Sequence, residues 1–145
     1  MYGVSPVQDR SATELGLEAV MTLKSTIVAL REVMVGEGLG YGIEWKASRP
    51  SRIAIVSTGY GDGYPQHPKG AEARVRGQLC PVVGRVSMDF LSLDVTKLQD
   101  VAVLDEVILW GKNIEVAEVA RAMEVSVYPL LTGVMARVPR CVLKV

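Results

Sequence analysis

Residues 52–65 read RIAIVSTGYGDGYP. The first seven of them are mostly apolar and β-branched, which is typical of a strand that is buried on at least one face. Glycines then alternate with Tyr60, Asp62 and Tyr64, so we expect a tight loop at the end of a sheet, where binding residues are often found. Asp62 alone does not make an EF-hand, and no Gly-Lys-Ser/Thr follows to make a P-loop. From these residues alone, a binding loop and a plain turn both remain open.

Further strands flank this stretch on both sides. Residues 20–35 alternate like a strand, and their apolar face changes near Val28, which indicates a bulge or bend. Residues 73–76 and 79–86 predict a hairpin around Gly77-Gln78. The remaining expected strands are 42–47, 90–95, 106–110 and 137–145.

Helices are few. An N-cap at Asn113, followed by apolar residues at helical spacing, predicts one helix, and residues 126–131 predict a second, short one. Because the strands follow one another through short turns rather than long helices, we predict a mainly β fold. We expect a Greek-key-like barrel of about seven or eight mostly antiparallel strands, with one or two short helices.

The charge balance limits the classes of partner. The chain has 145 residues, and its 16 Lys and Arg match its 16 Asp and Glu. A net charge of zero argues against a nucleic-acid partner or an acidic membrane surface, because both attract a basic excess. No run approaches the roughly 18 apolar residues of a membrane span, and no signal segment opens the chain. We therefore expect a cytoplasmic protein with no membrane or nucleic-acid partner.

The reactive side chains are sparse as well. The single histidine, His67, lies in a proline-bracketed loop, which favours a solvated side chain over a catalytic triad or a metal site. Cys80 and Cys141 lack metal-ligand spacing and favour a pair of reduced core thiols. No metal site is expected.

Two more segments combine glycines with chemically useful side chains. Residues 36–42 read GEGLGYG, and the glycines around Tyr41 let the backbone approach a ligand closely. The alternative is a tyrosine packed by its ring at a strand start. Residues 83–89 read VGRVSMD, in which Arg85 and Asp89 flank Met88. An Arg85–Asp89 ion pair that braces the loop is the alternative to a binding site there.

These segments occur in the order found in the C-terminal domain of alanine racemases, which the chain resembles over nearly its whole length. The resemblance rests on GYG at 40–42, GYGDGYP at 59–65, VGRVSMD at 83–89 and RVPR at 137–140, with MYGVSP at 1–6 and LWG at 109–111 also fitting. Each motif alone is weak, whereas the ordered set is specific.

The resemblance implies a protein of two domains. In the family, an N-terminal (β/α)8 barrel holds pyridoxal 5′-phosphate (PLP) on a lysine, and the β-domain of one subunit closes the barrel mouth of the other in a head-to-tail homodimer. Residues 1–19 are then expected to follow the barrel, and residues 20–145 to be the C-terminal β-domain. Neither Lys24 nor Lys46 matches the PLP lysine. This chain is therefore expected to bind no cofactor and to be inactive alone.

The resemblance also assigns roles to residues. The family interconverts L- and D-alanine, a step towards cell-wall peptidoglycan, with two acid/base groups on opposite faces of Cα. By motif, Tyr41 is the catalytic tyrosine that enters the partner subunit's site. Tyr60 and the backbone N–H of Met88 are expected to bind substrate, Arg85 to line the entrance corridor, and Asp89 to support its loop.

Two positions depart from the family pattern. Gln66 replaces an arginine that many relatives carry in the corridor, and Ala136 replaces a tyrosine that contacts the PLP phosphate in some. Two other functions stay open: a non-catalytic β-barrel module for assembly or binding, and a PLP-dependent amino-acid racemase of broader specificity.

Overall fold

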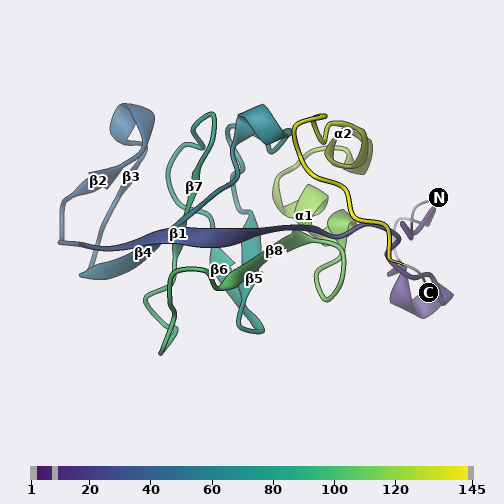
Figure 1. The fold of residues 1–145 in the computed structure, drawn as a ribbon, viewed down its shortest axis with the longest axis horizontal. Helices are drawn as coiled ribbons and strands as arrows, with labels where there is room; N and C mark the ends of the chain where they lie inside the picture. The colour runs from purple at the N-terminus through teal and green to yellow at the C-terminus, as the bar shows by residue number, and fades with distance from the viewer. Residues whose placement is uncertain (1–2, 8–9, 144–145) are drawn as a thin grey trace.

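The main element of the fold is a six-stranded antiparallel sheet of order β6-β5-β8-β1-β4-β7 (Figure 1). The computed structural model describes residues 3–7 and 10–143. The strands of the sheet are β1 (Leu23–Val33), β4 (Ser51–Val56), β5 (Glu72–Val75), β6 (Gln78–Pro81), β7 (Leu91–Asp94) and β8 (Glu106–Trp110). A second sheet pairs β2 (Gly38–Leu39) with β3 (Trp45–Lys46). The helices are α1 (Val116–Ala122), α2 (Val127–Thr132) and the 3-10 turns η1 (Thr13–Leu15), η2 (Tyr41–Ile43) and η3 (Tyr60–Asp62).

The two edges of the large sheet meet. Just beyond β6, Val82 forms an antiparallel bridge with Leu93 of β7, and the Val83 N–H donates to the Ser92 carbonyl at 2.9 Å. The sheet is therefore nearly closed into a barrel, as β-sheets close to remove exposed edges. The predicted mainly β, barrel-like fold with two short helices is confirmed, and its strand order is not sequential.

The core follows from the alternation of apolar side chains. β1 buries Leu23, Ile27 and Val33, and its register against β4 shifts between Ile27 and Ala29, which confirms the bulge predicted near Val28. Tyr64 and Trp110 stack inside the barrel with ring centroids 5.9 Å apart. α1 and α2 pack on one end of this core, whereas β2 and β3 project from the other end (Figure 1).

Glycine and proline break two of the predicted strands. Residues 42–47 are not one strand, because Gly42 and Ile43 both have positive φ and turn the chain within η2. Instead of continuing to residue 86, β6 ends at Pro81, which has no N–H to donate. The hairpin itself is confirmed. Its turn is residues 76–77, both with positive φ, a conformation that suits the twist of the flanking strands.

Predictions at the C-terminal end needed larger corrections. Asn113 is not an N-cap, because α1 begins at Val116 and Asn113 lies in a turn with φ 69°, a conformation that asparagine tolerates well. Residues 137–143 form no strand, and the remainder of that predicted strand, 144–145, lies outside the described residues. η1 was not predicted.

The outcome for the reactive side chains is mixed. His67 is exposed in its loop, as expected, with its Nδ1 3.6 Å from Oε2 of Glu44. Both cysteines are free, but only Cys80 is buried, so the expectation of two core thiols is half right.

Candidate functional site at one edge of the barrel

Tyr41 stands on a turn that glycines shape. Gly40 and Gly42 flank it with φ of 73° and 77°, in the left-handed region that favours glycine. The Tyr41 side chain is 69% exposed and adds nothing to the core. A fixed turn thus presents this hydroxyl to the outside of the domain.

The Tyr41 turn is locked onto the loop that carries Arg85. A Cβ on Gly40 would lie 2.9 Å from the backbone nitrogen of Arg85, and a Cβ on Gly84 would lie 3.1 Å from the Leu39 carbonyl oxygen. The two backbones approach so closely only because both positions lack a side chain. Tyr41 and Arg85 are therefore placed relative to each other by the backbone.

A groove of about 360 Å³ runs between these two loops and the barrel. The residues that line it are Gly40, Tyr41, Ile55, Arg85, Ser87, Phe90 and Ser92. The Nε of Arg85 is buried and has no hydrogen-bond partner among the described residues. A buried donor of this kind is costly unless a partner or ligand satisfies it. The groove is thus lined by the positively charged side chain of Arg85 next to the exposed Tyr41.

A third segment, the loop that contains Tyr60, packs on the Met88 backbone. The Tyr60 N–H donates to the Ser87 carbonyl at 3.0 Å, and the Gly61 N–H donates to the Met88 carbonyl at 2.9 Å. A Cβ on Gly59 would overlap both of these carbonyl groups. Gly59 and Gly61 are therefore required by this close approach. Gly63, the third glycine of the loop, lies against Gly133 and has a left-handed φ of 98°.

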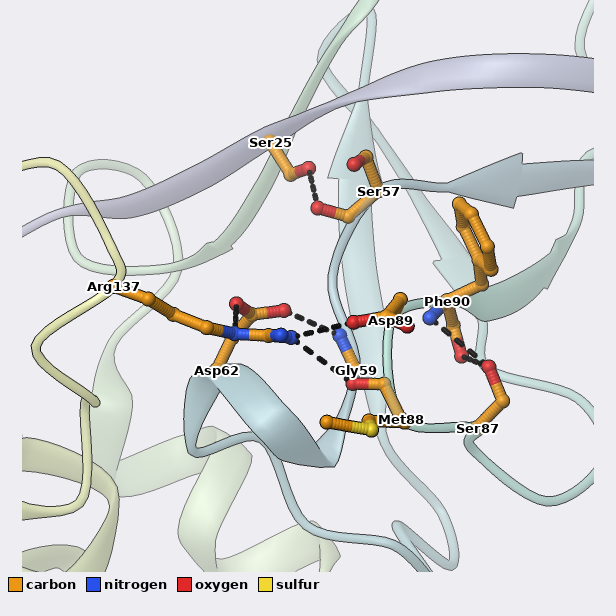
Figure 2. Close-up of polar contacts among 9 residues, drawn as sticks. All are labelled: Ser25, Ser57, Gly59, Asp62, Ser87, Met88, Asp89, Phe90 and Arg137. Atoms are coloured by element: carbon orange, nitrogen blue, oxygen red, sulfur yellow. Dashed lines mark hydrogen bonds and ion pairs between the residues drawn. The ribbon is translucent and has the colours of Figure 1, made fainter.

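Arg137 connects the Tyr60 loop to the loop that carries Met88 and Asp89 (Figure 2). Its Nε donates to Oδ1 of Asp62 at 2.8 Å, and its Nη2 donates to Oδ1 of Asp89 at 2.9 Å and to the Met88 carbonyl at 3.2 Å. The hydrogen bonds that Arg137 donates to the two carboxylates raise its pKa. The other Asp62 oxygen accepts the Gly59 N–H at 2.9 Å, so Asp62 closes its own turn as well.

The Met88 N–H is left available by this arrangement. Within residues 3–7 and 10–143, this N–H donates no hydrogen bond. In a trans peptide, the carbonyl of Ser87 and the N–H of Met88 point in opposite directions. Because the Ser87 carbonyl points at the Tyr60 backbone, the Met88 N–H points away from it. A free backbone N–H of this kind can donate a hydrogen bond to an anionic ligand.

The predicted site residues thus fall into two adjacent groups on one edge of the molecule. Tyr41 and Arg85 both line the groove, whereas Tyr60 and Met88 lie where the Tyr60 loop packs on the Met88 backbone. Ser87 belongs to both groups, since it lines the groove and its carbonyl accepts from the Tyr60 N–H. In Figure 1, η2 and η3 lie along the same edge, with the loop before β7 between them.

Two details differ from the sequence-based alternatives. Asp89 pairs with Arg137 and not with Arg85, so the Arg85–Asp89 ion pair considered for this loop is wrong. The role of Arg137 was missed, since its partners are 75 and 48 residues away in the chain. The only hint in the sequence was the RVPR motif, which gave no partner for the arginine.

The described residues lack both a cluster of metal ligands and a membrane-spanning helix. No group of three His, Cys, Asp or Glu side chains there could hold a metal ion. No described helix has the length and apolar character to cross a membrane.

The fold and this edge together define the class of the protein, a nearly closed antiparallel β-barrel domain with an exposed tyrosine and one free backbone donor along one edge. Residues 20–142 match the family described as "Alanine racemase, C-terminal domain", and the chain belongs to that family.

The relatives agree with the family match. The chain is 47% identical over 141 residues to an alanine racemase of Chromohalobacter salexigens and 50% identical over 141 residues to a biosynthetic alanine racemase of Pseudomonas aeruginosa. Each match covers 97% of this chain and 39% of the relative, so the chain spans about two fifths of these relatives' length.

Solved structures show the same fold. The crystal structure of the biosynthetic alanine racemase from Pseudomonas aeruginosa superimposes with a TM-score of 0.93 at 50% identity, covering 97% of this chain and 39% of that one. The alanine racemase from Acinetobacter baumannii gives 0.89 at 44% identity, covering 94% and 38%.

Proposed function

We propose that this chain serves as the C-terminal domain of a PLP-dependent alanine racemase, and that Tyr41 is one of the two groups that move the Cα proton. The observation that carries the proposal is Tyr41 itself. It is exposed, fixed between two glycines and placed beside a groove, in a domain whose relatives are alanine racemases. A side chain that does not serve its own core is free to complete a site on another domain.

In this proposal PLP belongs to the N-terminal barrel domain. A lysine that holds PLP is normally desolvated in a pocket. Every lysine among the described residues is exposed, namely Lys24, Lys46, Lys69, Lys97 and Lys112. The described residues therefore do not fit a PLP pocket, and they fit a surface that covers one. PLP held by the barrel supplies the electron sink that makes the Cα proton removable.

The contribution of Tyr41 is one oxygen at a fixed position. Inversion at Cα needs a proton taken from one face and returned on the other, which one group cannot easily do. The Tyr41 hydroxyl serves one face, and its turn must hold it within about 2.6–3.2 Å of the proton it moves. Since a tyrosine hydroxyl is ordinarily a very weak acid, cations from the barrel domain must favour its deprotonated form.

The remaining residues bind and guide the substrate. The Met88 N–H receives the substrate carboxylate, and Tyr60, on the neighbouring loop, narrows the entrance. Arg85 lines the corridor, where its charge attracts an amino-acid carboxylate. Asp89 acts on this loop through Arg137. Residues 1–19 connect this domain to the barrel.

The same proposal identifies the partner. Exposed apolar side chains lie on this edge, including Tyr41, Ile43, Tyr60, Met88 and Phe90, and exposed apolar clusters mark surfaces that become covered. We propose that the barrel of a second subunit covers them in a head-to-tail homodimer, and that the enzyme acts in the cytoplasm.

Replacing the proposed acid/base group tests the function. In the full-length protein with PLP, Tyr41→Phe should lower racemisation about 10²–10⁴-fold, the usual contribution of an acid/base group. Because L- and D-alanine are equally stable, kcat/KM must fall by the same factor in both directions. Exchange of the Cα proton with solvent, without inversion, should survive only for the enantiomer whose proton faces the other acid/base group. Racemisation and exchange, each measured from L- and from D-alanine, give these values.

Tyr64→Phe is the matched control. The Tyr64 hydroxyl is buried without a partner in the described structure, so removing it should leave the rates unchanged. Unchanged rates in Tyr41→Phe would refute the assigned role. Equal rates with alanine and with larger amino acids would instead indicate the broader-specificity racemase.

A further inference from the structure

We infer that Arg137 is a positioning residue for the substrate-binding edge, which it controls by clamping the Tyr60 loop and the Met88 loop together. The inference rests on the function proposed above. One guanidinium donates to three acceptors. They are the carboxylate of Asp62 on the Tyr60 loop, and the carboxylate of Asp89 and the carbonyl of Met88 on the Met88 loop. In Figure 2 its fork reaches both loops from the C-terminal segment.

The clamp acts beside the peptide unit that is proposed to bind substrate. The Met88 N–H belongs to the Ser87–Met88 unit, whereas Arg137 contacts the next unit, Met88–Asp89, and the Tyr60 loop, which hydrogen-bonds to both units. The Met88 carbonyl accepts from both Arg137 and the Gly61 N–H, and the preceding carbonyl, of Ser87, accepts from the Tyr60 N–H. With both carbonyls held, the peptide planes on either side of Met88 are fixed. The direction of the Met88 N–H is fixed with them, because each peptide unit is planar.

The Tyr60 loop, Arg137 and the Met88 loop are closely packed at Gly61. A Cβ on Gly61 would lie 2.6 Å from Nη2 of Arg137 and 2.9 Å from the Met88 oxygen. Backbone, guanidinium and carbonyl therefore pack at the closest distance that glycine allows. Met135 adds a further tie from the C-terminal segment, since its N–H donates to the Asp62 carbonyl at 3.0 Å.

Arg137 also balances charge. Two carboxylates share its single positive charge, and no other described residue forms an ion pair with either of them. Without Arg137, Asp62 and Asp89 would repel each other and would repel an incoming substrate carboxylate. Both effects weaken substrate binding.

This role is distinct from holding the fold together. The Arg137, Asp62 and Asp89 side chains are 41%, 18% and 53% exposed. The Arg137–Asp89 pair is open to solvent and contributes little to stability. The less exposed Asp62 carboxylate keeps its hydrogen bond from the Gly59 N–H when Arg137 is removed, so Arg137→Ala should shift the loops without unfolding the domain.

The test is steady-state kinetics on the full-length protein. Arg137→Ala should raise KM for alanine by about 10–100-fold, the loss expected when one hydrogen bond to a charged group is misaligned, while kcat changes much less. A merely structural loss would lower the active fraction, and so kcat, and leave KM unchanged. Arg137→Lys should give an intermediate KM, because one ammonium cannot reproduce the planar fork.

Arg140→Ala is the control. Arg140 belongs to the same motif and is also exposed, but its Nη2 donates only to the Val134 carbonyl, at 2.9 Å. Its KM should match that of the unaltered protein. A KM for Arg137→Ala equal to that of Arg140→Ala would overturn the inference.

Hydrogen exchange separates this inference from the proposed function. The Gly61 and Tyr60 amides should exchange faster in Arg137→Ala than in Arg140→Ala, whatever the reaction is. If the unaltered protein fails to racemise alanine, the proposed function falls, and the exchange result alone decides the clamp. Equal exchange in the two variants would overturn the clamp.

Discussion

At the scale of single residues, Gly59 and Gly61 on either side of Tyr60 are explained by contact rather than by φ. Gly59 has φ −144°, which any residue can adopt, yet a Cβ there would overlap the Ser87 and Met88 carbonyls. We therefore predict that Gly59→Ala destabilises the protein by about 1–3 kcal/mol, as overpacking does, and displaces the Met88 loop. Chemical denaturation measures the free energy of unfolding.

Gly36→Ala is the contrasting variant for this prediction. Gly36 has φ 87° and open space where its Cβ would lie, so only the left-handed conformation penalises alanine, by about 1–2 kcal/mol. Both variants should lose stability, but only Gly59→Ala should also raise KM for alanine. A normal KM in Gly59→Ala would contradict the contact argument.

At the scale of elements, an ion pair ties the β5–β6 turn to the loop before β8. Arg76 donates to both oxygens of Asp105, at 2.7 and 3.0 Å, and the Ala102 N–H donates to Asp105 at 2.8 Å. The hydrogen bond from Arg76 is the largest cause that lowers the pKa of Asp105. The ion pair therefore stabilises the folded protein above the pKa of Asp105 in the unfolded chain, about 3.9. This stabilisation is lost as pH falls through the lower pKa of Asp105 in the folded protein.

Asp105→Asn should therefore remove part of the loss of stability below about pH 4. The measurement is the free energy of unfolding from pH 7 down to pH 3. Glu32→Gln serves as the control, since Glu32 is exposed on β1 and forms no ion pair within the described structure. An unchanged pH profile in Asp105→Asn would contradict the role of this pair.

The elements also show what the sequence could predict. β4 and the β1 bulge were predicted because alternation and β-branching are local signals that depend on neighbouring residues only. The predicted strand is absent over its described part, 137–143, because an apolar segment does not indicate whether a sheet edge lies near it. Asn113 failed for a related reason, since asparagine suits both an N-cap and a left-handed turn.

The candidate site divides in the same way. Tyr41, Tyr60, Arg85 and Met88 were assigned by the order of motifs, and the fold brings them to one edge. The pairing of Arg137 with Asp62 and Asp89 depends on how three distant segments pack. Such a contact is a property of the tertiary structure and has no local signal.

At the scale of the whole molecule, the barrel depends on the seam between β6 and β7, where only an isolated bridge joins Val82 to Leu93. Cys80 lies on β6 beside this seam and is 2% exposed, whereas Cys141 is exposed. Burial is the main cause that raises the pKa of the Cys80 thiol to about 11. Because thiolate is the reactive form, Cys80 should react slowly for two reasons, low access and low ionisation.

We therefore predict two separated phases when the folded protein is labelled with a thiol reagent at neutral pH. Cys141 should react at the rate of a free thiol, and Cys80 only when the seam or the whole barrel opens. Cys141→Ser should leave a single slow phase, which urea accelerates in proportion to the fraction unfolded if the barrel opens as one unit. A slow phase that urea does not accelerate would instead show that the seam opens locally, since local opening exposes little surface.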